Sequence, residues 1–279
     1  MNIFDQMMAR YNTRNVDDHI NARHEVMQQI TLAGLQRGGF FDKAAFYGGT
    51  CLRIFYGLDR FSEDMDFSLL QPDQQFNLDQ YFEPVINEFR ALGREVVIDN
   101  KIKKIKSNIE SAFLKEDTSV FSLRFSAEPK VKIRIEVDTN PPLGFSTEQK
   151  LLLLPFSFMT HCYSLPDLFA GKMHAILFRN WKSRVKGRDW YDLEWHVRHN
   201  TAMNFNHLTN RVIQNGSLES EVFTKEYFLR LLKKKILETN IEAVKSDVRP
   251  FIKNPEEMDI WSQDYFTQLA DIIRFENES

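Results

Sequence analysis

Cysteine is scarce in this sequence, and the little that is present shows no pairing pattern. The 279 residues include two cysteines, Cys51 and Cys162, and neither has the spacing of a metal-binding or disulfide motif. His196 and His199 are spaced for one face of a helix, but no further cysteine or histidine completes a zinc set. A disulfide framework and a structural zinc site are therefore excluded, and the reducing cytoplasm is the simplest expectation for localisation.

Long apolar runs are also lacking. The longest aliphatic run, residues 151–154, ends at Pro155 and is far shorter than the roughly 20 residues that cross a bilayer. The first residues, Met-Asn-Ile-Phe-Asp-Gln, show no basic stretch followed by an apolar one. We therefore expect neither a signal peptide nor a membrane partner.

The sequence also lacks a strong excess of either positive or negative charge. The formal net charge is −3, so any contact with nucleic acid must come from a local basic patch. The sequence also lacks a Gly-x-Ser-x-Gly elbow, a Walker loop and a dinucleotide fingerprint. What it has in abundance is phenylalanine, with 24 residues, which predicts an aromatic-rich core in one large domain or two modest ones.

The strongest functional signal is a glycine turn followed by two spaced aspartates. Gly48 and Gly49 allow a phosphate to approach the backbone, and Thr50 adds a hydroxyl where a helix is expected to begin. Asp64 and Asp66 follow on an expected strand. Because strand side chains alternate between faces, the two carboxylates share one face, with Cα atoms roughly 6.5 Å apart.

Each part of this signal has a plainer interpretation. Gly-Gly alone is better explained as an ordinary turn from strand to helix, and Asp-x-Asp alone as two solvated acids on a surface strand. Their order, separated by the length of one helix, makes the combination specific. Paired carboxylates on a strand suit Mg²⁺ (or Mn²⁺), which takes one or two carboxylates together with substrate phosphate.

A third carboxylate is expected on a neighbouring strand. Residues 132–138 alternate apolar and polar side chains, which places Glu136 and Asp138 on the polar face. Either residue could complete a metal site. The alternative, an ion pair with Lys132 or Arg134, must hold for at least one of them.

A second block of chemically interesting residues follows after residue 164. Helical spacing puts Lys172 and Arg179 on one face, where Lys172 either is solvated or holds a triphosphate as a point charge. Asp189 and Asp192 lie three apart on a later helix. One of them would act on a substrate hydroxyl or orient Lys172. The alternative is an acid pair at the helix N-terminus with Arg188 as its partner.

The segment between these two helices is strongly basic. Residues 179–188 contain five basic side chains, no acid and one tryptophan. Interleaved basic and aromatic residues suit RNA phosphates and bases, although such runs are often only solvated loops. The candidate RNA-binding residues are Trp181, Lys182, Arg184, Lys186 and Arg188. A further basic stretch, residues 101–106, is interpreted as a solvated hairpin or part of the same RNA-facing surface.

The periodicity predicts an α+β protein with a mixed or antiparallel sheet, flanking helices and a C-terminal helical domain. The expected domains are residues 1–158 and 159–279. The first contains helices at 16–37, 50–56 and 77–92, strands at 63–70 and within 94–138, and a hairpin turn at 116–118. The second begins with a helix capped by Ser164, followed by helices at 189–199, 204–214, 222–237, 240–247 and 258–275.

Three blocks together resemble the AbiEii/AbiGii toxin family, nucleotidyltransferase-like proteins related to the DNA polymerase beta superfamily. They are residues 48–67, residues 170–179 and residues 186–193, and the stretch 136–142 matches one branch of the family. The resemblance implies a nucleotidyltransferase fold and a toxin of a bacterial toxin–antitoxin or phage-abortive system. Many superfamily members have Gly-Ser where this chain has Gly49-Thr50, and the hydroxyl is kept.

The resemblance also implies roles for individual residues. Asp64 and Asp66 would hold metal, with Glu136 or Asp138 as a third ligand, and Asp189 would serve in catalysis. The implied nucleotide contacts are Gly48, Gly49, Thr50, Arg53, Lys172 and Arg179.

The expected reaction is transfer of a nucleoside monophosphate from a nucleoside triphosphate to an acceptor hydroxyl, with RNA such as a tRNA end as the favoured acceptor. The alternatives are transfer to a protein side chain and a non-catalytic nucleotide-binding module. A cleft with Asp64 and Lys172 on opposite sides is expected between the two regions.

Overall fold

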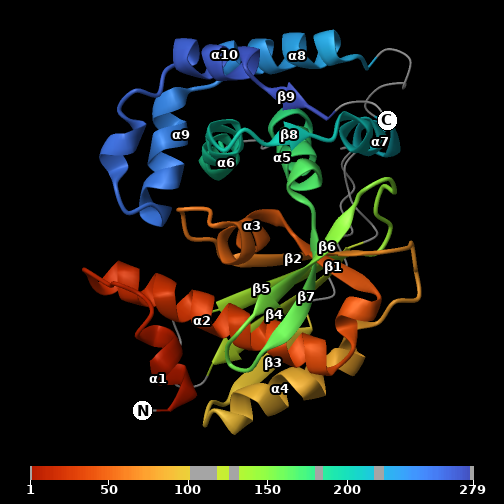
Figure 1. Ribbon diagram of the computed structural model, residues 1–279, viewed down its shortest axis with the longest axis vertical. Helices are drawn as coiled ribbons and strands as arrows, with labels where there is room; N and C mark the ends of the chain where they lie inside the picture. Colours follow the sequence, from red (N-terminus) through yellow and green to blue (C-terminus); the bar gives the residue numbers. More distant parts are fainter. Residues whose placement is uncertain (1, 101–117, 126–131, 180–184, 217–222, 277–279) are drawn as a thin grey trace, which may run out of the picture. The chain divides into compact units, whose positions relative to one another are not determined.

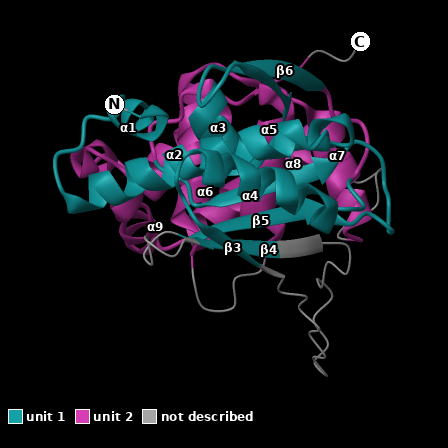
Figure 2. Cartoon of the chain, turned by 90° about the horizontal axis from the view of Figure 1, so that it is seen from below, with its two compact units in different colours: residues 1–55, 61–141, 147–162 teal, residues 56–60, 142–146, 163–279 magenta. Residues whose placement is uncertain are grey.

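The computed structural model describes residues 2–100, 118–125, 132–179, 185–216 and 223–276. The chain forms two compact units, coloured separately in Figure 2. Unit 1 contains residues 1–55, 61–141 and 147–162, and unit 2 contains residues 56–60, 142–146 and 163–279. Within the described ranges we find no helix with the length and apolar character that a bilayer crossing demands.

Unit 1 is built on a seven-stranded mixed sheet (Figure 1). Its helices are α1 (Ile3–Met8), α2 (Val16–Arg37), α3 (Gly48–Tyr56) and α4 (Phe82–Ala91). Its strands are β1 (Ala44–Tyr47), β2 (Asp64–Leu69), β3 (Val96–Asn100), β4 (Thr118–Phe125), β5 (Lys132–Asp138), β6 (Thr147–Leu152) and β7 (Phe158–Tyr163). The strand order is β3-β4-β5-β2-β1-β7-β6, which confirms the predicted α+β class with a mixed sheet.

The pairing of the strands brings two distant parts of the sequence together at the centre of this sheet. β2 lies between β1, to which it is antiparallel, and β5, to which it is parallel. β7 pairs in parallel with β1, and β4 pairs antiparallel with both β3 and β5. The strand that carries the two aspartates is therefore a central strand with neighbours on both sides.

Aromatic side chains pack against the buried face of the central strand, β2. Met65 and Phe67 of β2 are fully buried. The Phe67 ring stacks on Phe46 at 4.9 Å and meets Phe40 edge-on at 5.0 Å between ring centroids. These packed rings confirm the expected aromatic core and leave the opposite face of β2 for its polar residues.

Helices α2 and α4 lie side by side in unit 1 (Figure 1). α2 occupies the predicted range 16–37, begins at the Asn15 cap and is closed by Gly38. At the crossing, a Cβ on Gly34 would stand 2.5 Å from the Val85 Cα, so only glycine permits this approach. The close crossing fixes α4 against α2.

Two strands of unit 1 were not predicted from the sequence. β6 is an edge strand of mixed composition, Thr-Glu-Gln-Lys-Leu-Leu, so it lacks the alternation that marks a half-buried strand. β7 was missed because the chain was expected to turn helical near residue 160. Its pairing with β1 is a long-range contact that local periodicity does not reveal.

Unit 2 is mainly helical. Its elements are α5 (Leu165–Phe178), α6 (Gly187–Arg198), β8 (Ala202–Met203), α7 (Phe205–Gln214), α8 (Lys225–Glu238), α9 (Ile241–Val248), α10 (Gln263–Asp271) and β9 (Arg274–Phe275), with 3₁₀ turns at Arg249–Phe251 and Pro255–Met258. The last expected helix, 258–275, was wrong in extent. α10 starts only after the Ser262 cap, and the chain then forms β9, which pairs with β8.

Two predicted features lie wholly or partly outside the described residues. The hairpin turn expected at 116–118 lies at the edge of a gap, with residues 116–117 outside the described residues. The basic stretch 101–106 lies wholly outside them.

Candidate functional site

The glycine turn joins β1 directly to α3 in unit 1. Gly48 has φ 81°, a backbone conformation that residues with a side chain rarely adopt. A Cβ at this position would collide with the carboxylate of Asp66. The turn therefore lies directly against that carboxylate, and glycine is required both by conformation and by space.

Thr50, in the first turn of α3, is completely buried. Its hydroxyl donates a hydrogen bond to the main-chain oxygen of Asp64. This bond ties the glycine turn to the start of β2 and sets the spacing between the two parts of the motif. The predicted contact of Thr50 with phosphate stays a prediction.

Asp64 and Asp66 lie on the same face of β2, as the alternation predicts. Both are half-buried, whereas Met65 and Phe67 between and after them face the core. In the sheet, Asp66 lies beside Tyr47 of β1 and beside Glu136 of β5. The central strand thus presents two carboxylates next to the glycine turn.

The register separates the two candidates for a third carboxylate. Glu136 is the neighbour of Asp66 and forms an ion pair with Arg134 on its own strand, the alternative considered above. Asp138 is the neighbour of Ser68, is buried, and accepts a hydrogen bond from the Asn140 N–H at 3.3 Å. Among the described residues, no three His, Cys, Asp or Glu side chains converge closely enough to hold a metal ion. The metal set stays a prediction.

Arg53 of α3 is held by a network that the sequence did not reveal. Its Nε donates to Glu25 Oε2 at 2.8 Å, and its guanidinium lies over the Phe61 ring at 4.6 Å. Glu25 Oε1 accepts from the Tyr11 hydroxyl at 2.9 Å. Arg53 therefore forms a mostly buried ion pair with Glu25 in unit 1. Its contact with nucleotide stays a prediction.

In unit 2, a charged cluster forms where α5 and α6 pack together. The Lys172 Nζ lies 3.2 Å from Asp189 Oδ1 and 2.6 Å from Asp192 Oδ2. Arg60 donates to both oxygens of Asp192, from Nε at 2.7 Å and from Nη2 at 2.6 Å. The exposed fractions are 13% for Lys172, 4% for Asp189, 2% for Arg60 and 0% for Asp192. The sequence predicted that one of the two acids would act on a substrate hydroxyl or orient Lys172, whereas the structure places both acids beside Lys172. The contribution of Arg60 was not predicted.

The electrostatics of this cluster keep both acids ionised. Burial raises the pKa of Asp189, but the cations Lys172, Lys186 and Arg179 outweigh it and hold that pKa well below its usual range. For Asp192, burial again raises the pKa, and the opposing charges of Arg60 and Lys172 produce a net lowering.

His196 lies one helical turn after Asp192 and is fully buried. Its ring stacks on Phe169, with centroids 4.5 Å apart and planes inclined by 9°. Within the described part of the chain, neither of its ring nitrogens has a hydrogen-bond partner. Burial, the largest cause, lowers the pKa of His196 to about 3, so the ring is neutral beside the charged cluster.

Helix α5, which carries Lys172, is fixed at its start by Asp167. Helix formation begins after Ser164 as predicted, but the Ser164 hydroxyl donates to the Asp167 carboxylate at 2.6 Å instead of capping the helix. Asp167 also accepts from the Ser146 N–H at 2.9 Å and from Asn204 Nδ2 at 2.8 Å. The buried carboxylate thereby joins three segments of unit 2.

The predicted basic surface is only partly described. Arg179 is exposed at the end of α5 and Lys186 is half-buried before α6. Arg188 stacks over the Phe251 ring at 4.3 Å, so its aromatic partner comes from within unit 2. Trp181, Lys182 and Arg184 lie outside the described residues.

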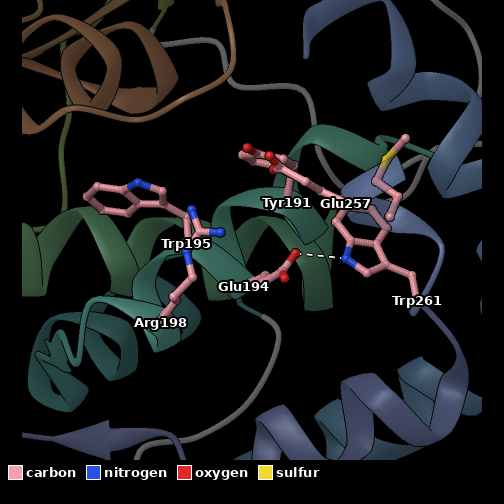
Figure 3. A pocket seen from close by; sticks show the side chains of 7 residues that line it. Tyr191, Glu194, Trp195, Arg198, Glu257 and Trp261 are labelled. Atoms are coloured by element: carbon pink, nitrogen blue, oxygen red, sulfur yellow. Dashed lines mark hydrogen bonds between the residues drawn. The ribbon is translucent and has the colours of Figure 1, made fainter. Parts of the chain in front are cut away.

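A small surface pocket lies on a different face of α6 (Figure 3). Glu194 accepts hydrogen bonds there from Trp261 Nε1 at 2.8 Å and from the Tyr265 hydroxyl at 2.6 Å. Residues 191, 194, 195 and 198 form this face, whereas 189, 192 and 196 form the face of the charged cluster. The pocket therefore does not coincide with the candidate chemistry.

Comparison with known proteins identifies the family of the chain. The sequence family described as nucleotidyl transferase AbiEii toxin, type IV toxin–antitoxin system, matches residues 30–278. The chain belongs to this family of nucleotidyltransferase toxins, which implies a nucleotide substrate and a cognate antitoxin. The comparison with curated proteins gave no match.

Solved structures share the fold at low sequence identity. JHP933 from Helicobacter pylori is 16% identical, with 90% of each chain covered and a TM-score of 0.53. MenT4, the nucleotidyltransferase toxin Rv2826c from Mycobacterium tuberculosis H37Rv, is 15% identical, with a TM-score of 0.54 over 95% of this chain and 86% of that one. At these identities the likeness concerns the fold alone.

Proposed function

We propose that this protein transfers a nucleoside monophosphate from a nucleoside triphosphate to a hydroxyl of RNA, and that it does so as a toxin. The observation that carries the proposal is the charged cluster of Lys172 and Asp189 in unit 2, found in the same chain as the glycine turn and paired aspartates of unit 1. The helical unit would complete the nucleotide site by supplying Lys172.

The residues of unit 1 suit a metal-bound triphosphate. Asp64 and Asp66 offer hard oxygen donors on one strand face, and Gly48 leaves the space beside Asp66 free of a Cβ. Mg²⁺, or Mn²⁺ in its place, would be held by these two carboxylates, with Glu136 or Asp138 as the proposed third. When bound, the ion supplies positive charge against the triphosphate oxygens.

The chain's own groups have separate tasks. The N–H groups at the start of α3 and the Lys172 ammonium offset the negative charge of the phosphates. The acceptor oxygen forms a bond to the α-phosphorus, the bond from that phosphorus to the β-phosphate oxygen breaks, and pyrophosphate leaves. Because Asp189 stays ionised, it is suited to orient Lys172 and to accept a hydrogen bond from the attacking hydroxyl, whose proton passes to water.

RNA is the proposed acceptor because basic residues lie next to the charged cluster's two helices. Arg179 is at the end of α5, and Lys186 and Arg188 are at the start of α6. The proposed setting is the bacterial cytoplasm, with a role in phage defence. Phage plating on cells that carry the toxin and antitoxin genes, with wild-type toxin or Asp64→Asn, tests this role.

The biochemical test uses each α-labelled nucleoside triphosphate with Mg²⁺ and either total cell RNA or total cell protein. Label on RNA is the expected result. Label on protein would replace the proposed acceptor with a side chain, and nucleotide binding without transfer would make the chain a binding module. Glu136→Gln and Asp138→Asn, compared in the same assay, identify the third carboxylate.

A further inference from the structure

Asp192 is the most completely neutralised acid of the charged cluster. Both of its oxygens accept from Arg60, at 2.7 and 2.6 Å, and Oδ2 also lies 2.6 Å from the Lys172 ammonium. Arg60 and Asp192 are 2% and 0% exposed, so water hardly reaches this pair. A two-point pair of this kind is geometrically fixed.

The cluster is balanced in charge. Two cations, Arg60 and Lys172, face two anions, Asp189 and Asp192. Without Arg60, the single ammonium of Lys172 would be held between two buried carboxylates. With Arg60 in place, Asp192 keeps its own counter-charge when Lys172 moves toward a phosphate, so only the ion pair with Asp189 is given up.

We propose that Arg60 is a positioning residue of the transfer reaction: by fixing and neutralising Asp192, it keeps Lys172 in place and available to the triphosphate. The inference rests on the proposed function. Arg60 acts through Asp192 and Lys172 and does not itself touch the substrate.

The position of Arg60 in the chain is informative. Residues 56–60 belong to unit 2, although they run from the last residue of α3 into the connection to β2. The short connection from the end of α3 to Asp64 therefore supplies one member of the cluster. Asp59 in the same segment forms an exposed pair with Arg198 at 2.8 Å, which offers a matched control.

The proposal predicts how the cluster responds to pH. The groups that face Asp192 are Arg60, Lys172, Asp189 and the neutral His196, and Lys186 and Arg179 act on Asp189. If Arg60 is removed, Asp192 loses its largest opposing charge, and burial raises its pKa. The acid is then easier to protonate, and activity that needs the ionised cluster is lost at a higher pH.

The activity experiment compares wild type with Arg60→Gln, Arg60→Lys and the control Asp59→Asn. We expect Arg60→Gln to lower kcat at least tenfold and to shift the acid limb of the pH profile of kcat to higher pH. Arg60→Lys keeps the charge but loses the two-point geometry, so we expect an intermediate kcat and a nearly normal acid limb. Asp59→Asn should leave both unchanged.

The double variant Arg60→Gln/Asp192→Asn tests the cause. It removes both members of the pair and leaves Lys172 with Asp189 alone, so the charge balance is restored. We expect its acid limb to return toward that of wild type. This variant also keeps the test decisive if Arg60→Gln alone fails to fold.

A second readout does not depend on transfer. In urea unfolding, the loss of stability of Arg60→Gln relative to wild type should be larger at pH 7.5 than at pH 5, because protonation of Asp192 relieves the excess negative charge. A loss equal at both pH values would mean that Arg60 only packs, and this would overturn the proposal.

Failure of the proposal and failure of the proposed function look different. If wild type transfers and Arg60→Gln transfers equally well with an unchanged acid limb, the positioning role is wrong and the function stands. If wild type transfers no nucleotide to any acceptor, the proposed function fails and takes this role with it.

Discussion

Arg60 and Asp192 form a two-point ion pair inside the helical unit, although 132 residues separate them in the sequence. Lys172 shares the same carboxylate, so removal of any one member leaves a buried charge without its counter-charge. The cluster is therefore both a part of the candidate site and a stability element. The first predictions follow from this double role.

Lys172→Ala is expected to abolish nucleotide transfer and to destabilise the protein. The variant leaves Arg60 alone against two buried carboxylates, and loss of one partner of such a pair costs about 3–5 kcal/mol. Urea unfolding and the labelled-transfer assay measure the two effects. Lys233→Ala is the control, because its pair with Asp271 is solvent-exposed and contributes no more than about 1 kcal/mol. Unchanged stability of Lys172→Ala would show that Lys172 is not needed to balance the two buried carboxylates.

Asp64→Asn and Asp66→Asn are expected to reduce transfer by about 10²–10³-fold, because each removes one oxygen anion from the proposed metal and phosphate site. Both side chains are half-buried on the polar face of β2, so the fold should be kept. Circular dichroism checks the fold, and nucleotide binding with and without Mg²⁺ checks the metal. Asp79→Asn, an exposed acid of the same unit, should behave as wild type. Full transfer by both site variants would show that the metal assignment is wrong.

Gly48→Ala is expected to be more damaging than a glycine substitution at an equally unusual backbone conformation. Gly93 has φ 69°, and a Cβ added there would meet no atom within 4 Å, so Gly93→Ala reports backbone strain alone, about 1–2 kcal/mol. Gly48→Ala adds a collision with the Asp66 carboxylate, and it should therefore also lower transfer. Equal effects of the two variants on stability and transfer would argue against a turn packed on Asp66.

The stability of the protein should fall as the pH drops below about 6.5, partly because of His196. The folded-state pKa of His196 is lowered to about 3, mainly by burial, so the unfolded chain binds a proton that the folded chain does not. Above the pKa of histidine in the unfolded chain, about 6.5, the neutral ring does not oppose folding. Below that pKa, each pH unit lowers the free energy of unfolding by about 1.4 kcal/mol until the folded-state pKa is reached.

His196→Phe removes this proton and keeps a ring against Phe169. We expect its unfolding free energy to depend less on pH between 6.5 and 4 than that of wild type. His19→Gln, at an exposed position of α2, is the control and should keep the wild-type slope. A slope unchanged in His196→Phe would show that this histidine is protonated in the folded protein.

The local elements could be predicted where one segment contains all of the signal. The range 16–37 has a cap, a helical period and a closing glycine, and it forms α2 as predicted. The alternation around Asp64 and Asp66 fixes their common face, because the period of a strand is two whatever its neighbours are. The extent of the last helix was mispredicted, because Ser262 and the β8–β9 pairing end and begin elements that hydrophobic spacing does not mark.

The sequence by itself determined the family, the α+β class, the glycine turn, the paired aspartates and the presence of Lys172 with Asp189 and Asp192. Only the tertiary structure decided that Glu136 lies beside Asp66 and that Arg53 is paired with Glu25. It also showed that Arg60 neutralises Asp192. The reason is physical: periodicity and capping act between residues a few positions apart, whereas strand register and buried ion pairs depend on packing between segments that are distant in the chain.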